Sequence, residues 1–154
     1  MTEGPSVPSE PSRRDEVLAV CRSVAAWAAA RPDVVAVGLA GSWARGAARA
    51  DSDVDLVLPT DVPERWIQAD DWIPVAVGQD ATPVRTQAWG VLTERRVRLA
   101  SGLEVELGIV PRDWAAEPVD DGTARVVGDG FRVLHDPVGV LSRLLTALGV
   151  GGDR

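Results

Sequence analysis

The chain contains no lysine and no tyrosine, and cysteine, histidine, methionine and phenylalanine occur once each. A single cysteine cannot form an internal disulfide, which favours a reducing, cytoplasmic location. One histidine and one cysteine are too few for a zinc cluster. No apolar run approaches the roughly 18 residues that cross a bilayer, so we expect no membrane partner.

All basic residues are arginines, and the formal net charge is -7. Abundant alanine, valine, arginine and aspartate without lysine indicates GC-rich coding rather than a chemical requirement. The acidic balance is more informative, because proteins that bind long nucleic acids usually carry a basic stripe, and the sequence shows none. We therefore expect a small-molecule or protein partner and no long nucleic acid.

The length of 154 residues and the apolar share of 45% fit one globular domain. Residues 1–14 contain three prolines among polar residues and lack an apolar segment, so we predict a disordered tail there. The domain itself is expected over residues 15–150. Ser12, with Asp15 three residues later, is a candidate N-cap for a helix over residues 13–30.

Short apolar runs and turn residues predict an α/β (α+β) domain, with a mixed β-sheet flanked by helices. A Ser101-Gly102 turn predicts a β-hairpin leading into the last long strand. Pro59 and Pro111 are expected to end strands. Apolar and polar residues alternate roughly over residues 87–99. Strands are expected at 34–40, 54–58, 72–77, 103–110 and 131–134, and further helices at 43–48, 61–71, 122–127 and 138–148.

Asp53 and Asp55 are separated by one residue at the start of a predicted strand. Residues i and i+2 of a strand point to the same face and lie about 7 Å apart. Magnesium prefers oxygen ligands and usually takes one or two carboxylates, with substrate phosphates completing its shell. Two carboxylates are few for a pair of ions, so we expect a third carboxylate from a neighbouring strand.

Glu106 is our choice for the third carboxylate, because it lies on the polar face of the strand that follows the predicted hairpin. Glu104 shares this face and is the competing choice. A carboxylate there could bind a cation and accept a proton. Alternatively, both glutamates simply face water. Arg95, Arg96 and Arg98 form a basic cluster beside the hairpin, for which a solvated strand face is the first explanation and a phosphate contact the second.

Gly41 and Ser42 lie between a predicted strand and a predicted helix. Glycine lets the backbone approach a ligand closely, and free N–H groups at a helix start favour an anion, to which a serine hydroxyl adds a donor. The alternative is an ordinary strand-to-helix turn capped by serine. Trp43 follows directly, and packing is the simplest role for it and for Trp27, Trp66 and Trp72.

Taken together, Gly41-Ser42, Ala44-Arg45-Gly46 and Ser52-Asp53-Val54-Asp55-Leu56 form a pattern whose spacing is more specific than any of its parts. It resembles the signature of the nucleotidyltransferase superfamily that includes DNA polymerase beta, and in particular its small prokaryotic members, the minimal nucleotidyltransferases. The match covers residues 34–58 in detail and the Glu106 strand more loosely.

The resemblance implies an acceptor hydroxyl that attacks the α-phosphate of a nucleoside triphosphate, with ATP and AMP transfer as the first choice. It implies Asp53, Asp55 and Glu106 as catalytic residues and ligands of Mg²⁺, with two ions expected. It also implies nucleotide contacts from Gly41, Ser42, Arg45 and Ser52. Arg45 either touches phosphate or pairs with an aspartate to brace the loop.

The sequence is compatible with three functions. The first is an enzyme that modifies a small-molecule or protein acceptor, bound within residues 60–89, across a homodimer interface or on a partner. The second is an antitoxin-type nucleotidyltransferase that adenylylates a helical toxin partner. The third is a non-catalytic nucleotide-binding module, against which the intact set of acidic residues argues.

Overall fold

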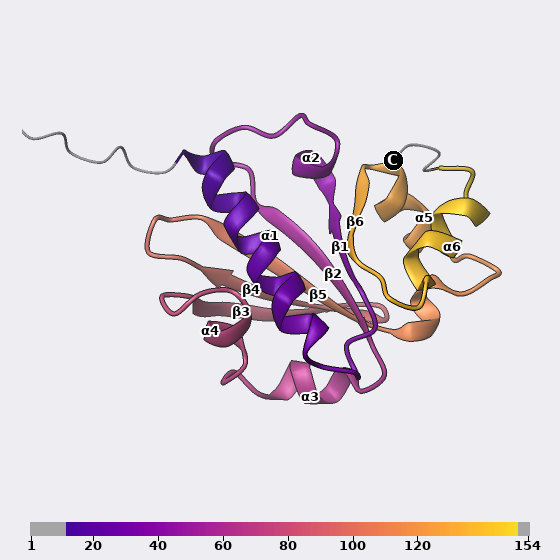
Figure 1. Ribbon diagram of the computed structural model, residues 1–154, viewed down its shortest axis with the longest axis horizontal. Coiled ribbons are helices and arrows are strands. Elements are labelled where there is room, and N and C mark those ends of the chain that lie inside the picture. The colour runs from indigo at the N-terminus through magenta and orange to yellow at the C-terminus, as the bar shows by residue number, and fades with distance from the viewer. Residues whose placement is uncertain (1–11, 151–154) are drawn as a thin grey trace, which may run out of the picture.

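A computed structural model describes residues 12–150 as a six-stranded mixed sheet with helices on both faces (Figure 1). The strand order is β3-β4-β5-β2-β1-β6, in which only β2 and β5 are parallel neighbours. The predicted α+β class with a mixed sheet is thereby confirmed. The strands are β1 Val37–Ala40, β2 Val54–Thr60, β3 Thr82–Trp89, β4 Leu92–Arg98, β5 Glu104–Pro111 and β6 Phe131–His135.

The helices begin with α1, which starts at Arg13 because the Ser12 hydroxyl accepts a hydrogen bond from the Asp15 N–H at 3.1 Å. This start lies two residues before the predicted domain boundary, and residues 1–11 of the predicted tail lie outside the described residues. The one-domain organisation stays a prediction. The helices are α1 Arg13–Ala29, α2 Gly41–Ala44, α3 Pro63–Gln68, α4 Ile73–Ala76, the 3-10 helix η1 Arg112–Ala115, α5 Asp121–Gly128 and α6 Val140–Ala147.

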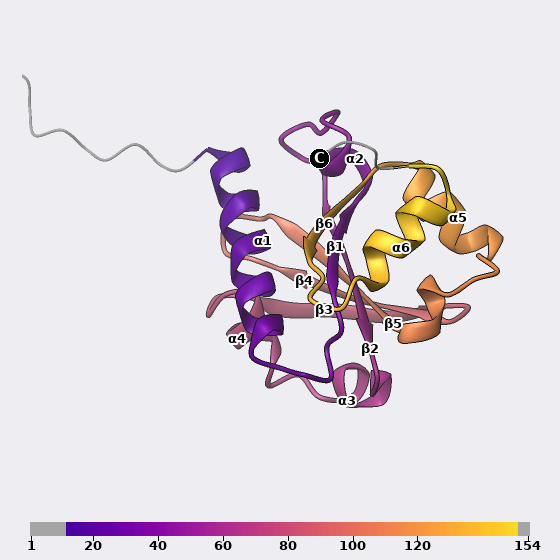
Figure 2. The same ribbon diagram turned by 45° about the vertical axis from the view of Figure 1, so that its right-hand side comes forward.

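Two apolar clusters lie on opposite faces of the sheet, as the strand period of two requires. Leu56 and Leu58 of β2 pack into a cluster with α1, α3 and α4, whereas Val57 between them packs with η1, α5 and α6. Figure 2 shows α1 on one side of β1 and β6, and α5 and α6 on the other. Within residues 12–150, no helix is both long and apolar enough to span a bilayer.

Three tryptophans join α1, α3 and α4 into one unit. Trp27, Trp66 and Trp72 are all buried, and their ring centroids lie 5.0 to 5.5 Å apart. The indole N–H of Trp66 donates to the Thr60 hydroxyl at 3.1 Å. The packing role predicted for these residues is therefore confirmed.

Several local predictions were wrong. Residues 72–77 form the turn of helix α4 instead of a strand, since Pro74 lies in its first turn and has no N–H for a sheet ladder. Strand β2 does not end at Pro59 but continues to Thr60. The proline is tolerated because the pairing of β2 with β1 stops at Val57, so the missing N–H of Pro59 leaves no gap in that ladder. Helix α2 begins at Gly41 rather than at residue 43.

Strand β3 was only partly foreseen, because all eight of its residues are exposed at the sheet edge and show no apolar alternation. The alternation of apolar and polar residues over 87–99 spans the last residues of β3, the turn at Gly90 and strand β4. The hairpin at Ser101-Gly102 is confirmed, and it sets the β4–β5 pairing on which the candidate site depends.

Candidate functional site

The parallel pairing of β2 and β5 brings Asp55 and Glu106 together, since the two are direct partners in the register. Neighbouring strands lie about 4.8 Å apart, so the two carboxylates are close on the same face. Asp53 precedes β2 and shares the face of Asp55 by the strand period. Three acidic residues predicted from the sequence therefore converge at one end of two adjacent strands.

Arg96 of β4 links these carboxylates. It is the register partner of Glu106, contacts it directly, and donates to Asp53 Oδ2 at 2.9 Å. It also contacts Glu104 at 2.8 Å and Glu94 at 3.0 Å. Its side chain is only 15% exposed. The predicted solvated face is therefore wrong here: Arg96 lies within a cluster of acidic groups.

The cluster shifts the protonation of its members. Burial, and then the charge of Asp53, raise the pKa of Asp55 to about 6. Burial, and then the charge of Asp55, raise the pKa of Glu106 to about 7. Burial works against the charge of Arg96, but hydrogen bonds to Asp53 and Glu104 outweigh it, so the pKa of Arg96 rises further. The pKa values of Asp55 and Glu106 therefore lie close to neutral pH, where these carboxyl groups can readily take up or release a proton.

Glu104 has surroundings different from those of Glu106. It pairs with both Arg96 and Arg98, and these hydrogen bonds lower the pKa of Glu104. Glu106 instead faces Asp55 directly and carries the raised pKa. This geometry favours Glu106 as the third member of the group, and Glu104 as a partner of the arginines.

Gly41 directly follows β1 and lies beside Asp55, and its conformation depends on the absence of a side chain. Its φ is +77°, and a Cβ atom would lie 2.6 Å from Asp55 Oδ2. Its N–H donates to the Gly130 carbonyl at 3.1 Å, so this amide is not free for an anion as predicted. The Ser42 hydroxyl donates to no group within residues 12–150, but Ser42 is not among the residues that line the carboxylate cleft described below.

The other two predicted nucleotide contacts brace loops. Arg45 donates to the backbone carbonyl of Asp129 at 2.7 Å, so it pairs with neither of the aspartate carboxylates at the site. The Ser52 hydroxyl accepts from the Arg49 N–H at 2.9 Å, and its carbonyl accepts from the Trp43 indole at 3.2 Å. Ser52 lines a separate hollow with Asp53 and Glu104.

A cleft of about 230 Å³ opens on the carboxylate face of the sheet. Asp55, Glu106 and Gly41 line one part of it, and Trp89 and Leu92 line another. Val126 of α5 and Asp129, the residue directly after that helix, also line it. The cleft therefore joins Asp55 and Glu106 to an apolar surface that was not expected there from the sequence.

Comparison with known proteins identifies the family. The family model described as "Nucleotidyltransferase domain" matches residues 21–112, a span of more than half of the chain. The chain belongs to the nucleotidyltransferase domain family. The predicted resemblance to nucleotidyltransferases is thereby confirmed, and the match runs from the middle of α1 through β5, including Gly41, Asp53, Asp55 and Glu106.

Among solved structures, the crystal structure of the Cid1 poly(U) polymerase is similar, with a TM-score of 0.45 and 13% sequence identity. The similarity covers 65% of this chain and 31% of that one, so the chain spans about a third of the length of that protein. No curated protein sequence matches the chain significantly.

The nucleotidyltransferase domain has a donor set that suits magnesium, since Asp53, Asp55 and Glu106 offer carboxylate oxygens on one face. Within the part of the chain that the structure describes, however, no three acidic, histidine or cysteine side chains are already arranged to hold a metal ion. The Arg96 guanidinium instead binds oxygens of Asp53 and Glu106, two of these three carboxylates.

Sequence reasoning missed the pairing of Arg96 with the carboxylates, and it assigned no role to Glu94 or Trp89. A usable signal existed for Arg96: pairing the strands outward from the Ser101-Gly102 turn aligns it with Glu106. Nothing local marked Glu94 or Trp89, because their partners come from register across the β3–β4 hairpin.

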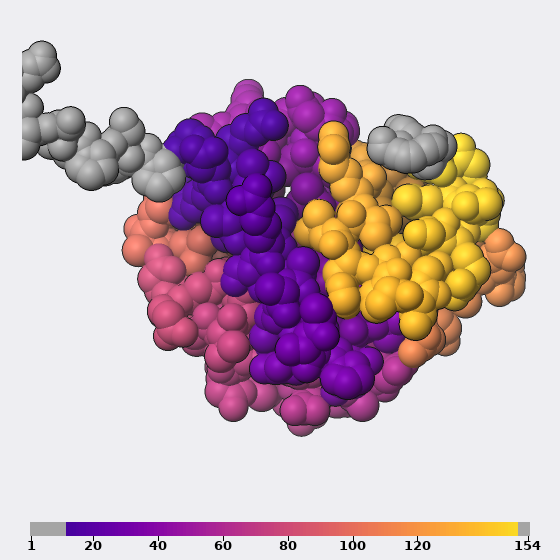
Figure 3. All heavy atoms as spheres, in the orientation of Figure 1, coloured from indigo at the N-terminus to yellow at the C-terminus, as the bar shows by residue number. Residues whose placement is uncertain are grey.

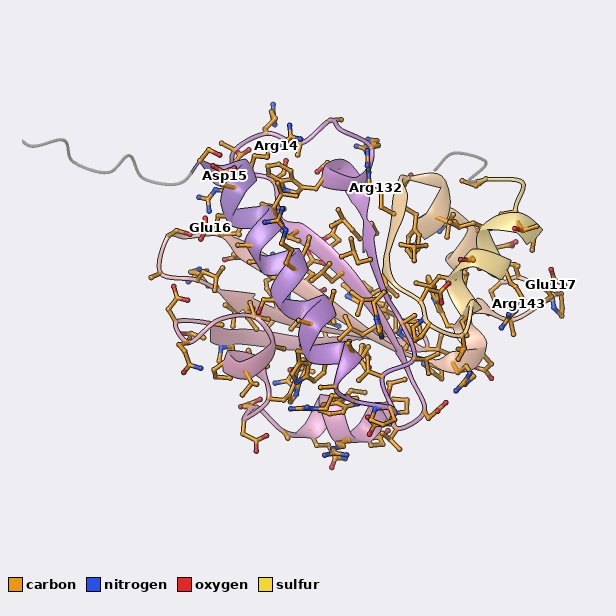
Figure 4. All side chains as sticks on the ribbon, in the orientation of Figure 1. Arg14, Asp15, Glu16, Glu117, Arg132 and Arg143 are labelled. Carbon is orange, nitrogen blue, oxygen red and sulfur yellow. The ribbon has the colours of Figure 1, made fainter. Side chains whose placement is uncertain are left out.

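A second, basic cleft of about 520 Å³ lies between α1, the loop after α2 and β6. Four arginines line it, and Trp43 lines it rather than the carboxylate cleft. Figure 4 shows Arg14 at the start of α1 and Arg132 on β6, and the space-filling view is hollowed between these elements (Figure 3). The arginines are Arg13, Arg14, Arg49 and Arg132. The sequence, which shows no basic stripe, gave no sign of this gathering.

Proposed function

We propose that this domain is a magnesium-dependent nucleotidyltransferase that moves a nucleoside monophosphate, AMP from ATP as first choice, to a hydroxyl of a small-molecule or protein acceptor. The observation that carries the proposal is the pairing of Asp55 with Glu106, with Asp53 beside them, inside the span matched by the family. No other described residues combine acidic side chains, an adjoining cleft and pKa values near neutrality.

The triphosphate is assigned to the end of β1. Gly41 leaves room beside Asp55, and the Ser42 hydroxyl is open to donate to a phosphate oxygen. Because the Gly41 N–H is already bonded to Gly130, phosphate binding relies on Ser42 and on the divalent ion more than the sequence pattern suggests. The side chains of Arg45 and Ser52 bond instead to the backbone, at the Asp129 carbonyl and the Arg49 N–H, and so stabilise the loops next to the site.

Asp53, Asp55 and Glu106 would hold Mg²⁺, for which carboxylate oxygens are preferred ligands. When bound, the ion supplies positive charge that stabilises the attacking and leaving oxygens of an in-line displacement. Arg96 holds the same carboxylates together and supplies positive charge at the same place. The residues are thus gathered beforehand, which lowers the cost of ordering them when a ligand binds.

Proton transfer is assigned to Glu106. In the reaction, the acceptor oxygen forms a bond to the α-phosphorus, the bond from that phosphorus to pyrophosphate breaks, and the acceptor hydroxyl loses its proton. A carboxylate with a pKa of about 7 is well matched to take that proton at neutral pH. Burial first, and then the charge of the neighbouring Asp55, keeps the pKa of Glu106 raised.

A second candidate function is a nucleotide-binding module without catalysis. The ion pairs of Arg96 favour it, since they bind the oxygens that a catalytic cation needs. In this case ATP would bind without any transfer. Release of pyrophosphate separates the two candidates, because only the enzyme breaks the α–β phosphate bond.

The test is to incubate the protein with ATP labelled at the α-phosphate, Mg²⁺ and a panel of hydroxyl compounds, and to measure labelled product and pyrophosphate. We expect transfer by the wild type and losses of at least a hundredfold in Asp53→Asn and Asp55→Asn. Asp51→Asn is the matched control, since its side chain is 86% exposed in the same loop. Equal transfer by all four proteins would contradict the site, and ATP binding without transfer would favour the module.

A further inference from the structure

Trp89 is an exposed tryptophan next to the carboxylate site. Trp27, Trp66, Trp72 and Trp114 are buried and Trp43 is half-buried, whereas Trp89 is 60% exposed. Leaving a large aromatic ring in water forgoes the hydrophobic stabilisation that its burial would give, so the position calls for an explanation. A ring partner would supply one.

The ring of Trp89 is held in a fixed orientation. Its indole N–H donates to Glu94 Oε1 at 3.0 Å, and Glu94 is in turn bound by Arg96 at 3.0 Å. Trp89 pairs with Leu92 in the β3–β4 register, which places it on the same sheet face as Glu94 and Arg96. The indole is therefore attached through Glu94 and Arg96 to the carboxylates of the candidate site.

The cleft beside Trp89 is small, and apolar residues form part of its lining. Leu92, Val57 and Val126 line it together with Gly108, where an added Cβ would meet Leu92 Cδ1 at 3.2 Å. Its volume of about 230 Å³ is below the roughly 300–1,000 Å³ of typical small-molecule sites. It has room for a single ring rather than for a whole nucleotide.

The position of Trp89 also indicates which substrate it serves. The proposed triphosphate site is at the end of β1, on one side of Asp55, and β5, β4 and β3 follow on the other side. The attacking and leaving oxygens of phosphoryl transfer lie roughly in line on opposite sides of the phosphorus. With pyrophosphate leaving toward Gly41, the acceptor arrives from the side of Glu106 and Trp89.

We infer that Trp89 is the stacking surface for a ring of the acceptor, which carries the attacking hydroxyl and is uncharged or cationic because Glu94 and Glu106 line the same cleft. This inference rests on the proposed function. A sugar with an apolar face and a phenol share this chemistry, and a ring on Trp89 places its hydroxyl toward Glu106, which takes the proton as the oxygen–phosphorus bond forms.

The test uses two probes, tyramine as the phenol and methyl β-D-glucopyranoside as the sugar, in titrations followed by the indole N–H signals of ¹⁵N-labelled protein. The chain has six tryptophans, and the signal lost in Trp89→Phe assigns Trp89. We expect one probe to shift this signal selectively. We also expect Trp89→Ala to bind that probe about tenfold more weakly, and Trp89→Phe to bind it nearly as well as the wild type.

Val91→Ala is the matched control, because Val91 is 60% exposed at the same hairpin but lies outside the lining of the cleft. It should bind the probe like the wild type. The inference is overturned if neither probe shifts the Trp89 signal, or if Trp89→Ala binds as well as the wild type. It is also overturned if protein concentration alone moves the Trp89 signal, since the hairpin is then a contact between copies of the chain.

Failure of the stacking surface can be distinguished from failure of the proposed transferase function. Probe binding at Trp89 without any release of pyrophosphate would leave the stacking surface standing and contradict the transferase. Transfer to tyramine or the glucoside with an unchanged acceptor KM in Trp89→Ala would support the transferase and contradict the stacking surface. A rise in acceptor KM with a KM for ATP within a factor of about two is the expected result.

Discussion

Arg96 is the residue on which the electrostatics of the site depend. One guanidinium contacts Asp53, Glu94, Glu104 and Glu106, in a protein whose net charge is -7. Removing one partner of a largely buried ion pair leaves uncompensated charge, which is more costly than never having had the pair. The carboxylates can stay together without a cation because Arg96 balances their repulsion.

The variant Arg96→Gln should therefore lower the free energy of unfolding by about 3 kcal/mol in the presence of a chelator. Urea denaturation measures this change. Arg98→Gln is the control, because the Arg98 side chain is 55% exposed and its pair with Glu104 should contribute under about 1 kcal/mol. Equal effects of both substitutions would mean that Arg96 does not hold the cluster together.

Asp55 should make stability depend on pH in the metal-free protein. Burial and the charge of Asp53 raise the pKa of Asp55 to about 6 from 3.8. The folded protein then holds a proton that the unfolded chain releases, so the stability contribution of Asp55 is complete below about pH 4 and is lost as pH rises through 6. Asp55→Asn should match the wild type at pH 4 and be more stable by roughly 2 kcal/mol at pH 8. A constant difference between the two proteins over this range would contradict the shift.

Gly41 and Gly46 offer a matched pair for testing the close approach to Asp55. Both have positive φ, +77° and +75°, but an added Cβ meets Asp55 Oδ2 at 2.6 Å only at Gly41, and nothing within 4 Å at Gly46. Gly46→Ala should cost about 1 kcal/mol for the backbone alone. Gly41→Ala should cost a further 1 to 2 kcal/mol or so and lower ATP affinity. Equal losses in thermal denaturation would show that Asp55 does not constrain Gly41.

Among the elements, the parallel pair β2 and β5 decides the site, because its register sets Asp55 against Glu106. A shift of one residue would turn Glu106 to the opposite face. The register is fixed from the other face, where Leu56, Leu58, Leu107 and Ile109 are all buried in the cluster beneath α1. The carboxylate face is thus aligned by the apolar residues that alternate with it.

Strand β4 holds α3 in place through Arg95, which points to the face opposite Arg96. Its side chain is 4% exposed and donates to the carbonyls of Trp66, Ile67 and Ala69 at the end of α3. These are carbonyls that a helix end leaves without partners. Arg95→Met should lower the free energy of unfolding by about 3 kcal/mol in urea denaturation, yet leave Mn²⁺ affinity unchanged. A change in Mn²⁺ affinity as large as that of Asp55→Asn would place Arg95 at the site.

The elements also show what a sequence can predict. Helix α1, strand β2 and the hairpin before β5 were predictable because capping, apolar runs and turn residues act locally. Strand β3 was not, since its residues are exposed and only pairing with β4 makes it a strand. Asp53, Asp55 and Gly41 follow from a local pattern, whereas the roles of Arg96 and Trp89 arise from register across strands.

At the scale of the whole molecule, the sheet is covered unequally. Helices α5 and α6 pack over β1 and β2 on the carboxylate face, while Trp89 and the exposed residues of β3 lie beyond them. This leaves a cleft between α5 and the β3–β4 hairpin, with the carboxylates at its edge. The predicted fold class described the layers correctly, but not which part of the sheet stays open.

The convergence of Asp53, Asp55 and Glu106 into one cation and nucleotide site is tested most directly by Mn²⁺ binding, followed by electron paramagnetic resonance with and without ATP. The wild type and Asp51→Asn should bind Mn²⁺ alike, with ATP strengthening the binding. Asp53→Asn, Asp55→Asn and Glu106→Gln should each weaken it at least tenfold. Equal Mn²⁺ affinity in all five proteins would contradict the account.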